Sequence, residues 1–195
     1  MQKTKIERED VMFPESYAPV RQQKKQALIA IKKNRRVEIG PVATCYFECF
    51  ETMVHQINEM LYIEKGGEDQ LKDELLAYDS LVPNGSELTA TVMFEIDEPV
   101  RRKNFLSKLG GIEETMFIKF GDHLVMGVPE ADVDRTTADG KASSVQFLHF
   151  PFTHDQIAEF KQAKEVIMGF KHEHYGHMVA IPQATHQALA KDFAE

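Results

Sequence analysis

Hydrophobic and polar residues repeat along the chain with two periods, and these periods predict where helices and strands lie. Apolar positions three and four residues apart are typical of a helix that buries one face. They predict helices at residues 14–34, 51–65, 68–78, 98–109 and 155–163, and a last helix that begins at Pro182. Runs that are apolar at every second position, or throughout, predict strands at residues 36–39, 42–50, 87–96, 115–120, 123–128, 144–152, 165–174 and 177–181.

The segment 87–96 has the clearest strand pattern. One face of this strand is apolar and consists of Leu88, Ala90, Val92, Phe94 and Ile96. The opposite, wetter face consists of Glu87, Thr89, Thr91 and Glu95. Farther along the chain, Gly121-Asp122 separates two predicted strands by two residues, which predicts a hairpin of type II′.

The predicted strands come in hairpin-like pairs with helices between them, without the strict alternation of a parallel sheet. We therefore expect a single α+β domain with a mainly antiparallel sheet and flanking helices. The first 13 residues, which begin with a charged segment, are expected to be flexible. Residues 129–143 are polar and without periodicity, and they are expected to form the longest loop.

Composition and charge narrow the function classes. The apolar fraction of 43% is that of an ordinary globular protein, and the net charge of −8 argues against general nucleic-acid binding. The segment from Arg21 to Arg36 carries seven Lys or Arg and no acid. Such a run is usually a helix face in contact with solvent, and its alternative role is to dock an acidic partner or ligand.

The chain carries no sign of export or membrane insertion. Its start lacks the apolar segment of a signal peptide, and no apolar run approaches the roughly 20 residues that cross a membrane. Cys45 and Cys49 lack the spacing of a redox motif, and we expect both to be reduced, buried thiols. These features predict a cytoplasmic protein.

The segment from His172 to His177 is the densest group of chemically useful side chains, with three histidines and Tyr175 in six residues. If strand 165–174 forms as predicted, His172 and His174 continue its apolar face, and His177 follows on the next strand beyond a turn at Gly176. Three imidazoles that converge there would coordinate a first-row metal. The alternative is that they cap the edge of a sheet and bind backbone groups.

Other candidate side chains lie on the helix at 51–65. One face of this helix carries Glu51, His55 and Glu59 at the spacing of metal ligands. That face is opposite the apolar stripe, so we expect a solvated ladder, in which the three side chains point into solvent. Gln56 borders the stripe and needs a hydrogen-bond partner if it is buried. In strand 144–152, His149 alternates with apolar residues and is expected to be a core histidine with satisfied hydrogen bonds.

The chain resembles a bacterial family designated domain of unknown function 3501. The resemblance extends from about residue 14 to the C-terminus and rests on short motifs at 36–41, 47–48, 56–61, 87–91, 144–150 and 172–177. It implies a cytosolic protein without an established activity. Members are typically encoded beside rubrerythrin-like and iron–sulfur oxidoreductase proteins, which implies a redox-linked role and such a protein as partner.

The resemblance also sorts the candidates. His172, Tyr175, His177, Gln56 and Glu59 fall on family-like positions, whereas His174 and His55 depart from the pattern. We therefore expect His172, His177 and Glu59 as metal ligands, for Fe or Zn, and Tyr175 and Gln56 as ligand-binding residues. His174 and Glu48 are the second choice.

Two function classes follow from these observations. The first is a protein that binds a divalent metal or a small anionic ligand at this site in redox-linked metabolism; whether it is an enzyme is left open. The second is a non-catalytic adaptor of a rubrerythrin-like or iron–sulfur protein. In this class the chain itself can form a homodimer. Neither class requires a membrane or a nucleic acid.

Overall fold

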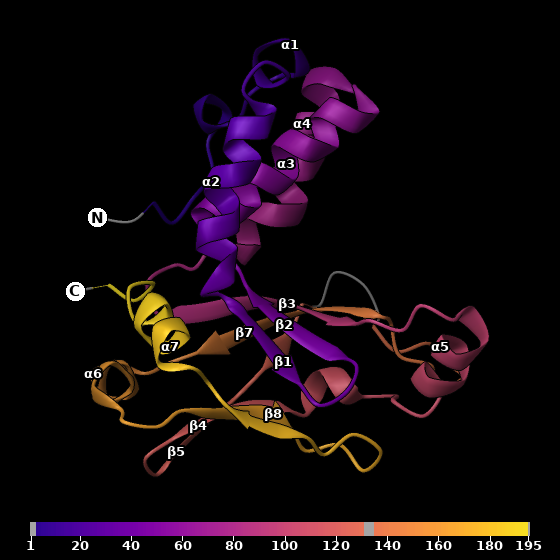
Figure 1. Ribbon diagram of the computed structural model, residues 1–195, viewed down its shortest axis with the longest axis vertical. Helices are drawn as coiled ribbons and strands as arrows, with labels where there is room; N and C mark the ends of the chain where they lie inside the picture. The colour runs from indigo at the N-terminus through magenta and orange to yellow at the C-terminus, as the bar shows by residue number, and fades with distance from the viewer. Residues whose placement is uncertain (1–2, 131–134, 195) are drawn as a thin grey trace.

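A computed structural model of the chain describes residues 3–130 and 135–194 and has three layers (Figure 1). A helical layer stands on one face of the first sheet, and the second sheet lies against its other face. All paired strands are antiparallel, so the predicted α+β class is confirmed.

The first sheet has the strand order β1-β2-β3-β7-β6, and the second has the order β5-β4-β8-β9. The strands of the first sheet are β1 (Arg36–Ile39), β2 (Ala43–Phe47), β3 (Glu87–Phe94), β6 (Val128–Pro129) and β7 (Val145–Pro151). Those of the second are β4 (Met116–Phe120), β5 (His123–Met126), β8 (Ile167–Phe170) and β9 (Met178–Ala180). Phe120 pairs with His123 across Gly121-Asp122, so the predicted two-residue hairpin is confirmed.

The helical layer consists of α1 (Pro14–Tyr17), α2 (Arg21–Lys33), α3 (Phe50–Glu64) and α4 (Gly67–Tyr78). The remaining helices are α5 (Pro99–Leu106), α6 (His154–Gln162) and α7 (Gln183–Leu189), with short 3₁₀ turns at Arg8–Asp10, Asp79–Leu81 and Ile112–Glu114. The sequence predicted one helix over 14–34, but the chain breaks between α1 and α2. Pro19 lies in this break, and proline lacks the N–H group that a continuous helix requires.

Two apolar cores hold these layers together. The larger core lies between the two sheets and contains the predicted apolar face of β3, from Leu88 to Phe94. The smaller core lies in the helical layer around Ile57 and Leu61. The predicted wetter face of β3 is not open to water throughout, because Thr89 is fully buried and its hydroxyl donates to the Leu81 carbonyl.

The segments expected to be irregular are partly ordered. Within residues 3–13, Ile6 and Val11 are buried in the smaller core. In the predicted loop 129–143, Pro129 belongs to β6 and Thr136 forms a bridge with Ala142, while residues 131–134 lie outside the described part.

Candidate functional site

The strand that was predicted to carry His172 and His174 ends earlier, at Phe170. The chain then turns, and the Tyr175 backbone N–H donates to the His172 carbonyl at 3.1 Å. His172 and His174 therefore do not continue the apolar face of β8, as the sequence analysis had expected. The turn falls at residues 172–175 and not at Gly176, because the local hydrogen bond takes precedence over the apolar alternation.

Both ring nitrogens of His172 have protein partners. Its Nδ1 accepts from the His174 backbone N–H at 3.2 Å, and its Nε2 lies 3.2 Å from the Gly110 carbonyl oxygen. With a proton on Nε2, this nitrogen donates and Nδ1 accepts, so backbone groups use both ring nitrogens. His172 thus has the role that the sequence analysis kept as the alternative, binding backbone groups at the end of a sheet.

Tyr175 joins the two sheets. Its buried hydroxyl donates to the Ile39 carbonyl at 2.6 Å and accepts from the Ala43 and Val42 N–H groups at 3.0 and 3.3 Å. Burial raises the pKa of this phenol. All of its hydrogen-bonding capacity is used within the protein, so it holds the β1–β2 turn and has none left for a ligand.

His177 is exposed at the surface and packs against Tyr175. Its ring meets the Tyr175 ring edge-on, with centroids 4.5 Å apart. Gly40 lies against both: its φ is +69°, and a Cβ there would be 2.5 Å from His177 Cγ and 2.9 Å from the Tyr175 hydroxyl oxygen. Glycine at position 40 is therefore required. The family-like motifs at 36–41 and 172–177 meet at this sheet joint, which we define as Gly40, Tyr175 and His177 with the backbone groups they contact.

Glu59 lies in the helical layer, where it joins α3 to α1 and α2. Its carboxylate accepts from the Arg21 guanidinium at 2.8 Å, from the Tyr17 hydroxyl at 2.7 Å and from Lys25 at 3.1 Å. The hydrogen bonds from Arg21 are the main reason that the pKa of Glu59 falls to about 2. The predicted solvated ladder is therefore wrong for Glu59, because α2 covers this face of α3.

The predicted metal ligands are not brought together. Glu59 is held by the helical layer, whereas His172 and His177 lie at the β8–β9 turn. In the ranges 3–130 and 135–194, no group of three or more His, Cys, Asp or Glu side chains is arranged to hold a metal ion.

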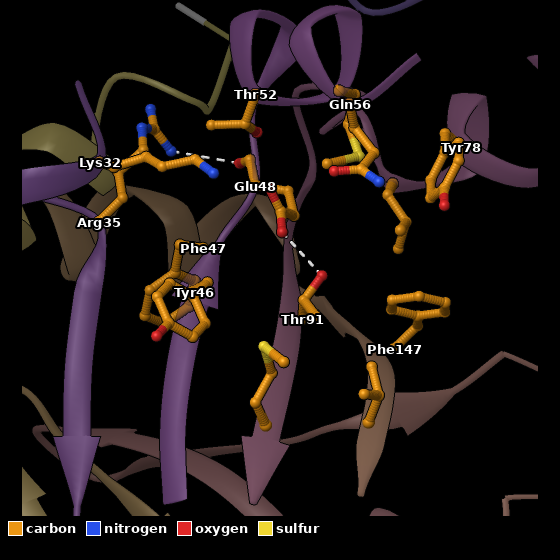
Figure 2. A pocket seen from close by; sticks show the side chains of 14 residues that line it. Lys32, Arg35, Tyr46, Phe47, Glu48, Thr52, Gln56, Tyr78, Thr91 and Phe147 are labelled. Atoms are coloured by element: carbon orange, nitrogen blue, oxygen red, sulfur yellow. Dashed lines mark hydrogen bonds between the residues drawn. The ribbon is translucent and has the colours of Figure 1, made fainter. Parts of the chain in front are cut away.

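The structure does bring together two other candidates, Glu48 and Gln56, in a cavity between the helical layer and the first sheet (Figure 2). This interlayer pocket has a volume of about 450 Å³, which suits a small organic ligand. Its apolar walls are formed by Phe47, Met53, Leu81, Met93, Val145 and Phe147. Its polar lining comes from α2, β2, α3, α4 and β3, and Glu48 is its central group.

Glu48 is a buried carboxyl group at the junction of β2 and α3. One oxygen, Oε1, accepts from the Thr91 hydroxyl at 2.7 Å. Burial raises the pKa of Glu48, while hydrogen bonds from Thr52 and Thr91 and the positive charges of Lys32 and Arg35 oppose the rise. The desolvation of the charged form is the largest of these effects, so this carboxyl group is easier to protonate than an exposed one.

Two cations line the same pocket but differ in their partners. Arg35 is buried and forms two hydrogen bonds with the Asp192 carboxylate, at 2.6 and 2.7 Å, while its Nη1 also donates to the Glu48 backbone carbonyl. Its charge is therefore balanced within the protein. Lys32 lies at the exposed end of α2 and extends toward Glu48 (Figure 2).

Gln56 and Tyr78 line the pocket from α3 and α4. Burial raises the pKa of the Tyr78 phenol, and a hydrogen bond with the Gln56 side chain partly offsets that rise. Gln56 thus has the hydrogen-bond partner that its place beside the apolar stripe requires. The partner is Tyr78, which lies 22 positions later in the chain, and no local pattern indicates it.

Three further pocket residues are not indicated by the sequence pattern: Lys32, Thr91 and Met93. Thr91 and Met93 lie on the face of β3 that the helices cover. A threonine in the middle of the wetter face of an otherwise apolar strand was the only available signal. Lys32 belongs to the basic run, and nothing in the sequence distinguishes it from Lys33.

His149 is not the core histidine that was expected. It is half-buried on β7, with Nδ1 3.0 Å from Glu87 and Nε2 3.4 Å from Glu130. The hydrogen bond with Glu87 is the main reason that its pKa is raised. Cys45 and Cys49 are free and buried, as predicted, and burial raises the pKa of Cys49 to about 11, so neither is a ready nucleophile.

Comparisons with known proteins identify the family of the chain. No helix in the described residues has both the length and the apolar character needed to cross a membrane. No curated protein sequence matches the chain. A crystal structure of a novel protein of unknown function from Burkholderia pseudomallei is 36% identical, covers 97% of this chain and 100% of its own, and superposes with a TM-score of 0.90. Residues 5–193 match the family described as "Protein of unknown function (DUF3501)", and the chain therefore belongs to that family.

Proposed function

We propose that the protein binds a small organic anion with an apolar body in the interlayer pocket. The observation that carries this proposal is the cavity itself, of about 450 Å³, with a buried carboxyl group and other polar side chains set into mostly apolar walls. Such a combination of apolar surface with a few convergent polar groups is typical of small-ligand sites.

Three hydrogen-bond donors in the lining favour an anion over a cation. The Lys32 ammonium lies at the exposed end of the pocket, and the amide of Gln56 and the hydroxyl of Tyr78 can donate hydrogen bonds. A carboxylate is the simplest group that would accept from these donors, with its hydrocarbon part against Phe147 and Met93.

The test measures binding of sodium octanoate, sodium benzoate and 2-naphthoate by isothermal titration calorimetry. We expect at least one acid to bind with a dissociation constant below about 1 mM. Met93→Trp, which fills the pocket, should abolish this binding, whereas Met126→Trp on the exposed face of β5 should not. Lys32→Gln should weaken it about tenfold, and Lys33→Gln, its neighbour outside the pocket, should leave it unchanged.

An absence of binding by these acids and by octan-1-ol would contradict the proposal. Binding that survives Met93→Trp would place the ligand elsewhere. The redox-linked role that the family resemblance implies stays a prediction, and the identity of the natural ligand would test it.

A second candidate, the adaptor, has one observation in its favour. Leu124, Met126 and Val128 are exposed on consecutive edge strands, β5 and β6, with 37 to 50% of their surface open. By contrast, much of the basic segment is used inside the protein, because Arg21 and Lys25 pair with Glu59 and Arg35 pairs with Asp192. If this edge is the interface of a homodimer, light scattering should give a dimer that Met126→Lys converts to a monomer.

A further inference from the structure

We infer that the interlayer pocket takes up one proton together with its organic anion, and that Glu48 is the group that receives it. This inference rests on the proposed function and adds a mechanism of selection to it. In the bound state, the Glu48 carboxylic acid would donate a hydrogen bond to the carboxylate of the ligand, while Lys32 supplies the positive charge.

The charges around the pocket require this proton. Arg35 is balanced by Asp192, so the two other charges among the lining residues are those of Lys32, at the exposed end, and the ionised Glu48. They cancel each other, and an incoming anion would meet a second carboxylate, that of Glu48, which is itself buried. Two carboxylates in one site do not both stay ionised at neutral pH, because their repulsion is large where solvent is excluded.

The geometry around Glu48 supports its role as the proton acceptor. Its neighbours from each packed element are Lys32 of α2, Arg35 before β1, Tyr46 and Cys45 of β2, Cys49 before α3, and Tyr78 of α4. The phenols and thiols among them are held in their neutral forms by burial. Glu48 is the one carboxyl group among the 14 lining residues, and no histidine is among them.

The proton balance of the step is simple. A buffer acid loses a proton, an O–H bond forms on Glu48, and the site changes from neutral to singly positive before the anion neutralises it. The Thr91 hydroxyl keeps its hydrogen bond to Oε1 and Thr52 keeps its contact with the same carboxyl group, while the new O–H group on Oε2 would point to the ligand. A monoanion is matched by this single positive charge, and a dianion is not.

The experiment is calorimetry of sodium octanoate binding at pH 7 in phosphate and in imidazole, two buffers with very different ionisation enthalpies. The difference in observed enthalpy gives the number of protons that the complex takes up, and we expect a value close to one. Octan-1-ol, which carries no charge, should bind with no proton uptake in the same two buffers.

Glu48→Gln gives the matched variant, because a glutamine resembles the protonated acid in size and in its ability to donate. It should bind octanoate at least as tightly as the unchanged protein at pH 8, with no proton uptake. The affinity of the unchanged protein should fall by up to about tenfold for each pH unit above the pKa of Glu48, and that of the variant should stay constant.

The outcomes separate the two proposals. Octanoate that binds without proton uptake would overturn the inference and leave the proposed function in place. If neither octanoate nor octan-1-ol binds, the proposed function fails and the inference fails with it. Should Glu48→Gln not fold, the two-buffer measurement on the unchanged protein still decides the matter.

Discussion

The sheet joint and the interlayer pocket both contain buried polar side chains, but they differ in how completely these side chains are satisfied. At the sheet joint, the Tyr175 hydroxyl makes three hydrogen bonds with backbone groups, and Gly40 leaves no room for another atom. In the interlayer pocket, Glu48 and Gln56 face a cavity of about 450 Å³. Polar side chains whose hydrogen-bond donors and acceptors are all used by the protein stabilise the fold, whereas polar side chains that face a cavity can contact a ligand.

This comparison explains why the most conspicuous segment of the sequence is not the best candidate site. The cluster from His172 to His177 is rich in metal-binding side chains, yet its tyrosine and its first histidine are occupied by backbone groups. The residues that line the pocket come from α2, β2, α3, α4, β3, β7 and the 3₁₀ turn at Asp79–Leu81, and no segment of the chain supplies more than a few of them. The density of such side chains along the chain therefore indicated a segment in which His172 and Tyr175 bond to backbone groups.

The largest expected effect on the free energy of unfolding comes from adding a side chain at Gly40 in the sheet joint. Gly40→Ala should destabilise the protein by about 3 kcal/mol or more, because it adds strain at positive φ to a clash with His177 and Tyr175. Gly67→Ala is the matched control: its φ is similar, at +71°, but nothing lies within 4 Å, so we expect a cost of about 1 kcal/mol. Urea unfolding of both variants measures the difference, and equal costs would show that the joint is not tightly packed.

Glu59→Gln tests the other closed region, the contact of α3 with α1 and α2. The pKa of about 2, against the ordinary 4.5, sets an upper bound of about 3 kcal/mol on the stability contributed at pH 7, and solvent screening of the partly exposed Arg21 and Lys25 reduces it. Because this pKa is lowered by folding, the contribution is complete above pH 4.5 and disappears as the pH falls toward 2. The variant should therefore lose most at neutral pH and little at pH 2.

The exposed Glu51 on the same helix provides the control for that measurement. Glu51→Gln should change the free energy of unfolding by less than about 0.5 kcal/mol at any pH. A loss from Glu59→Gln that does not depend on pH would mean that packing, and not the ion pairs, holds the helices together.

Tyr175→Phe removes only the hydroxyl group from the sheet joint. We expect a loss of about 2 kcal/mol, since the Ile39 carbonyl and the Ala43 N–H would be left without this partner in the interior. Binding of octanoate in the interlayer pocket should be unchanged, because the two regions are separate. Tyr46→Phe, whose hydroxyl bonds to the exposed Glu95, should cost less than about 0.5 kcal/mol.

The smallest effect, with the opposite sign, is expected in the interlayer pocket. Burial raises the pKa of Glu48, so its ionisation opposes folding, and stability falls as the pH rises from the unfolded pKa through the folded one. Glu48→Gln should therefore stabilise the protein at pH 8 and have little effect at pH 4. A destabilised variant at pH 8 would mean that the ionised carboxylate supports the fold, and that the pocket is structural like the joint.

Much of the fold follows from the sequence because it depends on neighbours along the chain. The alternation from Leu88 to Ile96 and the hairpin at Gly121-Asp122 are local, and both were predictable. The break between α1 and α2 is also indicated locally, by Pro19, although the apolar periodicity predicts one continuous helix. Helix and strand ends depend on such single residues and on local hydrogen bonds.

The roles of the polar residues were decided only by tertiary structure. Tyr175 bonds to Ile39 across 136 residues, and Arg35 bonds to Asp192 across 157. A periodic pattern records which face of an element is buried, but not which element covers it. That is why the sequence determined the α+β class and the elements, whereas packing alone turned His172, Tyr175 and Glu59 into structural groups and left Glu48 and Gln56 facing a cavity.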